Sequence, residues 1–143
     1  MSNNNNPIPL IQGWAIYLRT SSKDAQNPET SHGRQQDAIY KALVTPSGLD
    51  VLYVYRDVES GLKTDRQQYR QMLYDARRGL FSHIGVAAHD RFGRKGTEAL
   101  SACDELRELG IELRFANHPT LSLHDDQATF IFFMFFGLAE QEI

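Results

Sequence analysis

The segment Trp14-Ala15-Ile16-Tyr17-Leu18, followed at once by Arg19-Thr20-Ser21-Ser22, decides the fold of this chain. Its apolar half contains β-branched and aromatic residues and follows Gly13, a combination that predicts a short buried strand. The polar half places a guanidinium and several hydroxyls directly after that strand. We therefore expect a sheet whose first strand ends in polar chemistry.

The same alternation of an apolar strand with an amphipathic helix repeats along the chain. Further strands are expected at 51–55, 84–88 and 111–116, and helices at 31–44, at 65–78, between Thr97 and Gly110, and from about 125 to the chain end. Thr97 is expected to cap the third helix. Pro46 with Gly48, Gly79 and Gly110 are expected to end the first three. A repeated βα pattern predicts an α/β sandwich around a mainly parallel sheet.

Length and composition place the chain among ordinary globular domains. It has 143 residues and a mass of 16.3 kDa, which fits a single domain. With 41% hydrophobic and 23% charged residues, a disordered chain, a collagen and a coiled coil are excluded. The single cysteine, Cys103, lies on the apolar stripe of a predicted helix and cannot form an internal disulfide. A reducing, cytoplasmic setting is therefore expected.

Charge is distributed unevenly along the sequence. The formal net charge of -3 by itself argues against a general nucleic-acid binder. Residues 56–95, however, carry nine basic against five acidic side chains, whereas residues 96–143 carry two against nine. Eleven of the fifteen basic residues are arginine, which favours forked binding of phosphate or carboxylate. The basic excess thus coincides with two of the predicted strand ends.

The sequence contains no visible targeting or membrane-spanning segment. Residues 1–6 are polar and asparagine-rich, and we expect a disordered lead-in at 1–12, followed by one domain at 13–143. The most apolar run, Phe130 to Leu138, has nine residues, whereas a membrane helix needs about 20. Acidic residues flank this run, so no membrane partner is expected.

Three predicted strand ends carry an unusual set of polar residues. Arg19 and Ser21 follow the first strand, Arg56-Asp57-Val58-Glu59-Ser60 and then Asp65-Arg66 follow the second, and His89-Asp90-Arg91-Phe92-Gly93-Arg94 follows the third. Each set alone reads equally as a turn, a helix cap or a local ion pair. Because sites gather at the carboxyl ends of parallel strands, we expect all three sets along one edge of the sheet.

A hydroxyl among arginines and carboxylates suits attack on a phosphodiester. Guanidinium forks hold phosphate oxygens and stabilise the charge that develops in the transition state. A serine nucleophile also needs a group that removes its proton, and the sequence leaves that group open. No cofactor is implied, and no residue spacing predicts a metal site. Another phosphate-handling enzyme on a flavodoxin-like sheet is an alternative, but its glycine-rich phosphate loop or acidic metal cluster is missing.

The ordered motifs resemble those of the serine recombinases, the resolvase/invertase family. The segments that carry the resemblance are Tyr17-Leu18-Arg19-Thr20-Ser21, Asp57-Val58-Glu59-Ser60-Gly61 with Asp65-Arg66, Asp90-Arg91-Phe92-Gly93-Arg94, and Ala139-Glu140-Gln141-Glu142, together with Gln35. They extend from the first strand to the end of the chain. The resemblance implies a three-layer sandwich with a mainly parallel but mixed sheet of four to five strands and a long C-terminal helix.

The resemblance also implies a recombinase site that needs neither metal nor ATP. Ser21 is the implied nucleophile, which links to the 5′ end of cleaved DNA as a phosphoserine, and Ser22 is a neighbouring hydroxyl. The positions implied to bind or orient the scissile phosphate are Arg19, Arg91, Arg94, Asp90 and, more distantly, Arg66. The positions implied to support them are Gln35, Asp57, Ser60 and Glu142.

The composition of the last predicted helix indicates that the chain associates with further copies of itself. Residues 130–136 are apolar on nearly every face, and a helix that is apolar all round needs burial on more than one side. The resemblance agrees, because in this family the helix forms the dimer contact. We expect a homo-oligomer, dimer to tetramer, through residues 125–143.

The spacing of the motifs refines the resemblance. The chain between Ser21 and Gln35 is longer than in compact resolvases, which fits the large integrases and transposases better. It stops at Ile143, so we expect a bacterial or phage-encoded catalytic domain, truncated in its final helix and without DNA-binding domains, that binds DNA weakly alone. A catalytically inactive interaction or regulatory domain is the other alternative. The set Arg19, Ser21, Asp90, Arg91 and Arg94 argues against it.

Overall fold

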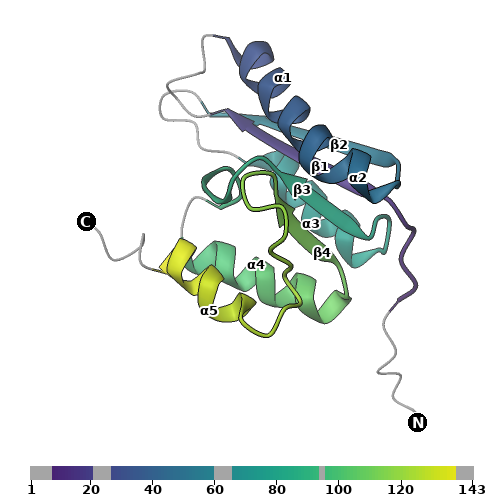
Figure 1. Ribbon diagram of the computed structural model, residues 1–143, viewed down its shortest axis with the longest axis vertical. Helices are drawn as coiled ribbons and strands as arrows, with labels where there is room; N and C mark the ends of the chain where they lie inside the picture. Colours follow the sequence, from purple (N-terminus) through teal and green to yellow (C-terminus); the bar gives the residue numbers. More distant parts are fainter. Residues whose placement is uncertain (1–7, 21–26, 60–65, 94–95, 138–143) are drawn as a thin grey trace.

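The computed structural model describes residues 8–20, 27–59, 66–93 and 96–137 (Figure 1). Its four strands are β1 (Trp14–Thr20), β2 (Val51–Val58), β3 (His83–Val86) and β4 (Glu112–Phe115). They form one sheet in the order β2-β1-β3-β4. Every pair of neighbouring strands is parallel. A mainly parallel sheet of four strands is thus confirmed, and no antiparallel strand occurs within these residues.

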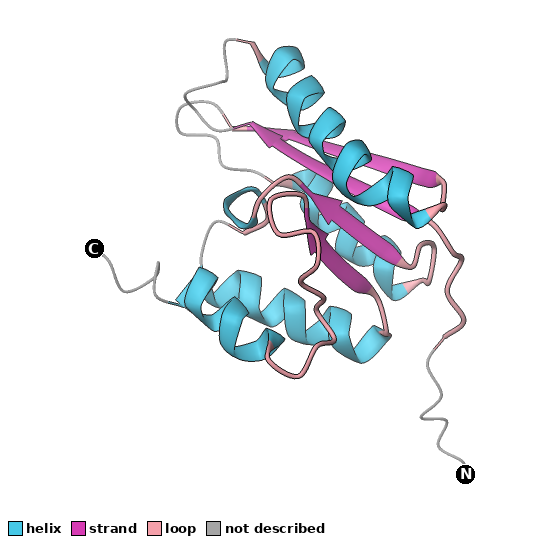
Figure 2. Ribbon diagram, viewed as in Figure 1, coloured by secondary structure: helices cyan, strands magenta, loops and turns pink. Residues whose placement is uncertain are grey.

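Helices cover both faces of this sheet (Figures 1 and 2). The helical segments are α1 (Pro28–Ile39) with its continuation η2 (Tyr40–Val44) and α2 (Thr45–Ser47), α3 (Gln67–Arg77), the 3₁₀ turn η3 (His89–Arg91), α4 (Gly96–Leu109), α5 (Ala128–Phe132) and η4 (Phe133–Gly137). The segment from α1 to α2 lies on one face, and α3 and α4 lie on the other. The predicted three-layer α/β sandwich is therefore confirmed.

The central strand β1 connects the layers because both of its faces are buried. Alternate side chains of a strand point to opposite faces. Trp14, Ile16 and Leu18 pack against the α1 layer. Ala15 and Tyr17 pack into the larger core with the helices of the other face. The next residue on that second face is Arg19, which is why a guanidinium enters the interior at the end of the strand.

Two of the residues expected to begin or end a helix act differently in the structure. Pro46 does not end the first helix, because it lies within α2, which continues η2 without a break, and the chain stays helical to Ser47. Gly48 ends the helix instead, with a left-handed φ of 75°. Thr97 does not cap α4, because that helix already begins at Gly96 and residue 97 lies inside it.

The last predicted helix begins later than expected. It was predicted from about 125 to the chain end, and the described part has α5 and the π-turn η4, from Ala128 to Gly137. Residues 138–143 lie outside the described part, so the prediction of a long C-terminal helix is not tested beyond Gly137. Glu112 holds the preceding loop by accepting hydrogen bonds from the Ser122 hydroxyl at 2.6 Å and the Leu123 N–H at 2.8 Å.

Residues 8–12, from the expected lead-in, lie against the end of α3. The Ile11 N–H donates to the Gly79 carbonyl at 3.0 Å. Among the helices of the described ranges, none has both the length and the apolar character needed to cross a membrane.

Candidate active site

The strand order creates one preferred position for a site. From β1 the chain moves outward to β2, then crosses back to β3 on the other side of β1. In open α/β sheets, ligands bind at the carboxyl ends of strands where the chain direction reverses in this way. Here that position lies between the ends of β1 and β3, and the residues found there are Arg19 and the turn His89–Arg91.

The guanidinium of Arg19 bridges the ends of three strands. It donates to the main-chain carbonyls of Asp90 and Arg91, which follow β3. Its Nη1 lies 2.9 Å from the Glu59 carboxylate, which follows β2. The arginine is 7% exposed. The predicted convergence of the three polar strand ends on one edge of the sheet is confirmed.

Gln35 fixes the main chain at the same point. Its amide Oε1 accepts from the Arg19 N–H at 3.2 Å, and its Nε2 donates to the Arg19 carbonyl at 2.9 Å. The side chain itself is buried and also donates to the Ser31 hydroxyl. Gln35 therefore holds the main chain of Arg19 at the end of β1, two residues before Ser21 in the sequence.

Asp57 and Arg66 are joined through Tyr17. The Tyr17 hydroxyl donates to the Asp57 carboxylate at 2.8 Å and accepts from Arg66 Nη2 at 3.2 Å. Burial raises the pKa of Tyr17 far above its ordinary value, with Arg66 opposing the effect, so the phenol stays a hydrogen-bond donor. Asp57 also accepts from the N–H groups of Gln68 and Tyr69 and thereby caps α3.

Arg66 lies deeper in this network than Arg19. Its guanidinium donates to the Phe92 carbonyl and pairs with Glu98 at 3.1 Å. Its Cζ lies 3.7 Å from the centre of the Tyr69 ring, a close cation–π contact. These contacts fix the guanidinium of Arg66 in the interior, next to the Tyr17 hydroxyl.

His32 supports the other side of β1. Its Nε2 shares a hydrogen bond with the hydroxyl of Thr20, and both residues are buried. Burial is the largest cause that lowers the pKa of His32; Asp57 opposes this effect. The lowered pKa favours the neutral ring. This ring contacts Thr20, the residue that directly precedes Ser21.

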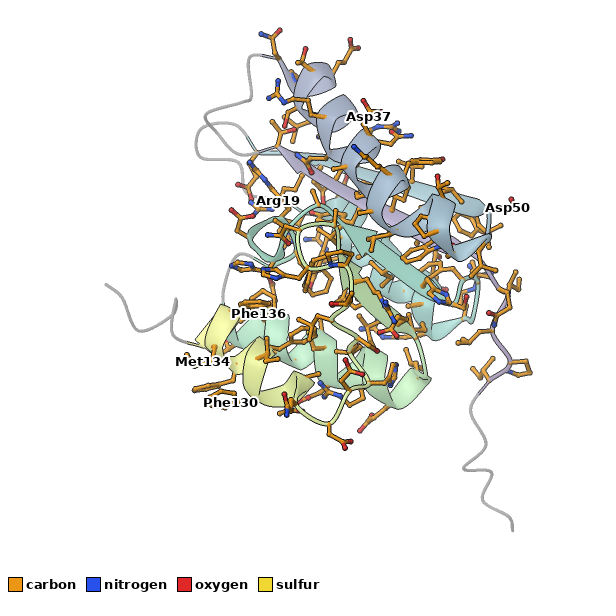
Figure 3. All side chains as sticks on the ribbon, in the orientation of Figure 1. Arg19, Asp37, Asp50, Phe130, Met134 and Phe136 are labelled. Carbon is orange, nitrogen blue, oxygen red and sulfur yellow. The ribbon has the colours of Figure 1, made fainter. Side chains whose placement is uncertain are left out.

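A cleft of about 360 Å³ opens beside Arg19. The residues that line it are Arg19, Glu59, His89, Asp90, Gly93, Gly96, Phe135 and Phe136. The His89 ring stacks on Phe135 with 4.4 Å between ring centres, so the last helical segment forms one wall. Figure 3 shows Phe136 on the same side of the molecule as Arg19, whereas Phe130 and Met134 point outward.

Gly93 allows the wall of the cleft to pack closely. A Cβ at this position would overlap the Cβ of Ala99 on α4. The loop after β3 can therefore lie directly against α4 only because residue 93 has no side chain.

The predicted site residues separate into two groups. Those that the structure brings together at this edge of the sheet are Arg19, Gln35, Asp57, Arg66, Asp90 and Arg91. Those that lie outside the described residues are Ser21, Ser22, Ser60, Arg94 and Glu142. The arrangement of the first group places a buried guanidinium at the rim of a cleft, where its Nη1 faces the carboxylate of Glu59, and such a position suits an anion.

Three further residues belong to this arrangement but were not singled out from the sequence. They are Tyr17, His32 and Glu59. Tyr17 and Glu59 lie inside quoted motifs, and alternation along β1 places Tyr17 on the same face as Arg19. His32 has no comparable signal, because its partner Thr20 is on a different element. Among the described residues there is no group of three side chains suited to hold a metal ion.

Comparison with known proteins identifies the family. Residues 14–143 match the family model described as "Resolvase, N terminal domain". A curated relative from Bacillus subtilis (strain 168), named "Putative DNA recombinase", is 33% identical over 103 residues, which are 72% of this chain and 20% of that protein. The chain thus spans about a fifth of the length of that relative.

Solved structures share the fold. The N-terminal catalytic domain of TP901-1 integrase matches with a TM-score of 0.71 and 21% identity, over 92% of this chain and 96% of that one. A resolvase family site-specific recombinase from Streptococcus pneumoniae gives the same TM-score of 0.71 and 21% identity, over 92% and 89%. The C-terminal catalytic domain of ISC1926 TnpA, an IS607-like serine recombinase, gives 0.57 and 24%, over 74% and 67%. The sequence resemblance is confirmed by the family model, and residues 14–143 of this chain belong to the resolvase N-terminal domain family.

Proposed function

We propose that this chain is the catalytic domain of a serine site-specific recombinase that cleaves and religates DNA through a covalent phosphoserine. The observation that carries the proposal is the guanidinium of Arg19. It is buried at the carboxyl end of β1, at the rim of a cleft and two residues before Ser21. A nucleophile on this segment would reach a phosphate that the arginine holds.

The proposed chemistry conserves bond energy. The Ser21 oxygen attacks the phosphorus and forms a P–O bond, while the bond to the DNA 3′ oxygen breaks. The serine loses its proton and the leaving 3′ oxygen gains one, so the products are a 5′-phosphoserine and a free 3′ hydroxyl. Religation reverses the step with a 3′ hydroxyl of the recombining strand as the nucleophile.

Each described site residue has a role in this proposal. Arg19 and Arg91, with Arg94, bind the scissile phosphate and stabilise its charge in the transition state. Arg66 contributes positive charge from behind Tyr17, and Asp90 orients the arginines or transfers protons. Gln35 and Asp57 hold β1 and α3 in place. Ser60 and Glu142 are proposed as supporting positions.

The proposed partners are DNA and further copies of the chain. The formal net charge of the chain is -3 and the basic excess is limited to residues 56–95, so the isolated domain is expected to bind DNA weakly. Phe130, Phe133 and Met134 are exposed on the last helical segment. We propose that residues 125–143 join protomers there.

The decisive experiment uses the full-length protein and a suicide substrate that contains its own recombination site. Wild type should accumulate a covalent protein–DNA adduct, and Ser21→Ala should not. The matched control is Ser22→Ala, which should still form the adduct. Loss of the adduct in Ser22→Ala alone would show that Ser22 is the nucleophile. The absence of an adduct in wild type would contradict the proposal.

A further inference from the structure

Glu59 occupies the place on Arg19 that an anionic ligand would need. Its carboxylate lies 2.9 Å from Arg19 Nη1, and the two side chains are only 12% and 8% exposed. Arginine binds carboxylates and phosphates with the same fork geometry. A carboxylate in this position therefore satisfies the guanidinium in the way that a phosphate oxygen would.

The other described partners of the Arg19 guanidinium differ in kind. They are the main-chain carbonyls of Asp90 and Arg91, which cannot leave without rebuilding the turn after β3. Glu59 is held by its main chain, where its N–H donates to the Thr20 carbonyl at 3.2 Å. Its carboxylate is the end of a side chain with three rotatable bonds, and it can turn away while the main-chain contact stays.

The carboxylate of Glu59 and an incoming phosphate would compete for the same edge of Arg19. Arg19 and Glu59 both line the cleft of about 360 Å³, which is open to solvent. Two anions that compete for one edge of a guanidinium repel each other. A phosphate can therefore bind that edge of Arg19 only after the carboxylate of Glu59 has left it.

We propose that Glu59 is a phosphate mimic that covers Arg19 in the absence of DNA and that the scissile phosphate displaces it. This inference rests on the proposed function, because it takes a DNA phosphate as the ligand of Arg19. It assigns Glu59 to the site as a competitor of the substrate. The opposite role, a positioning residue that keeps Arg19 ready for the phosphate, predicts the opposite result on substitution.

The test measures binding of inorganic phosphate to the 143-residue chain at constant ionic strength. The NMR signal of the Arg19 Nε–Hε group reports on the guanidinium directly. Glu59→Gln should bind phosphate at least about tenfold more tightly than wild type, because the competing charge is gone. The matched control is Glu105→Gln, which removes the same charge from another Arg–Glu pair, with Arg77 on the surface between α3 and α4. It should bind phosphate as wild type does.

Two results would overturn the inference. One is phosphate affinity in Glu59→Gln that equals or falls below wild type, which indicates a positioning role. The other is an equal gain in Glu105→Gln, which indicates general electrostatics. If Glu59→Gln fails to fold, Glu59→Asp replaces it: this variant keeps the charge but shortens its reach, and a smaller gain is expected, whereas no gain overturns the proposal.

The suicide-substrate experiment separates this inference from the proposed function. A wild-type adduct without any gain of phosphate affinity in Glu59→Gln overturns the inference about Glu59 alone. A gain of affinity without an adduct supports the anion site on Arg19 and overturns the recombination chemistry. In the full-length protein, Glu59→Gln should form the adduct at lower DNA concentration than wild type.

Discussion

The side chain of Gln35 makes the hydrogen bonds to Arg19 that a neighbouring strand would otherwise make. β3 ends at Val86, which pairs with Tyr17, so no β3 residue continues the ladder along the last residues of β1. The Gln35 amide takes over by bonding both the N–H and the carbonyl of Arg19, 16 positions away in sequence. The main chain before Ser21 is thereby held by a helix side chain.

Gln35→Ala should destabilise the chain strongly. It removes the side-chain acceptor of the buried Arg19 N–H and leaves the Arg19 carbonyl with only the 3.4 Å contact from Arg91 Nη1. A buried main-chain group without a good partner costs about 1–3 kcal/mol. We expect the free energy of unfolding in urea to fall by about 2–4 kcal/mol. The control is Gln36→Ala on the same helix, with an expected change within about 0.5 kcal/mol. Equal losses in both variants would show that Gln35 acts only through helix propensity.

Tyr17→Phe should cost stability, whereas Tyr69→Phe should not. The Tyr17 hydroxyl connects Asp57 with Arg66, and its removal leaves two buried charged groups with one partner fewer. The neighbouring Tyr69 hydroxyl is buried with no hydrogen-bond partner among the described residues. We expect a loss of about 1–3 kcal/mol for Tyr17→Phe in urea unfolding, and no loss or a small gain for Tyr69→Phe. A loss in Tyr69→Phe as large as in Tyr17→Phe would contradict the network.

His32 should make the fold less stable in mild acid. Because burial lowers its pKa below 6.5 in the folded chain, the unfolded chain binds a proton first as the pH falls. The contribution of His32 is therefore complete above pH 6.5 and is lost as the pH falls from 6.5 through the folded-state value. The measurement is an NMR titration of the His32 ring in the folded chain. A midpoint at or above 6.5 would contradict the buried, neutral ring.

The sequence predicts the edge of the sheet better than it predicts the contacts there. The predicted strand ends after Leu18 and Tyr55 follow from short apolar runs, which are local signals, and they fall just before the observed ends at Thr20 and Val58. The pairing of Arg19 with Glu59 depends on the register between β1 and β2, and the bond from Gln35 depends on where β3 stops. Both are set by tertiary packing, so no local pattern encodes them.

The capping of α3 illustrates the same limit. A helix was predicted from Asp65, yet the described helix begins at Gln67. The carboxylate that binds its first N–H groups comes from Asp57 on β2. A residue ten positions before the helix can act as its cap only because β2 and α3 meet at the same edge of the sheet.

Self-association should depend on the outward face of the last helical segment. Phe130 is 66% exposed and Met134 is 43% exposed, while the opposite face buries Phe132 and Phe136 in the core. Exposed apolar side chains that adjoin one another mark an interface. We expect sedimentation velocity to show concentration-dependent oligomers of the wild-type chain. The double substitution Phe130→Glu with Met134→Glu should give a folded monomer, because it places charge on this face and leaves the buried face intact.

The matched control for this face is Tyr74→Glu. Tyr74 is also exposed, at 54%, but it lies on α3 on another part of the surface. This variant should associate as wild type does, since its charge lies outside the proposed contact. A wild-type chain that stays monomeric at high concentration would contradict the proposed interface. Loss of association in Tyr74→Glu alone would show that the interface lies on α3 instead. Circular dichroism on all three chains separates lost association from lost folding.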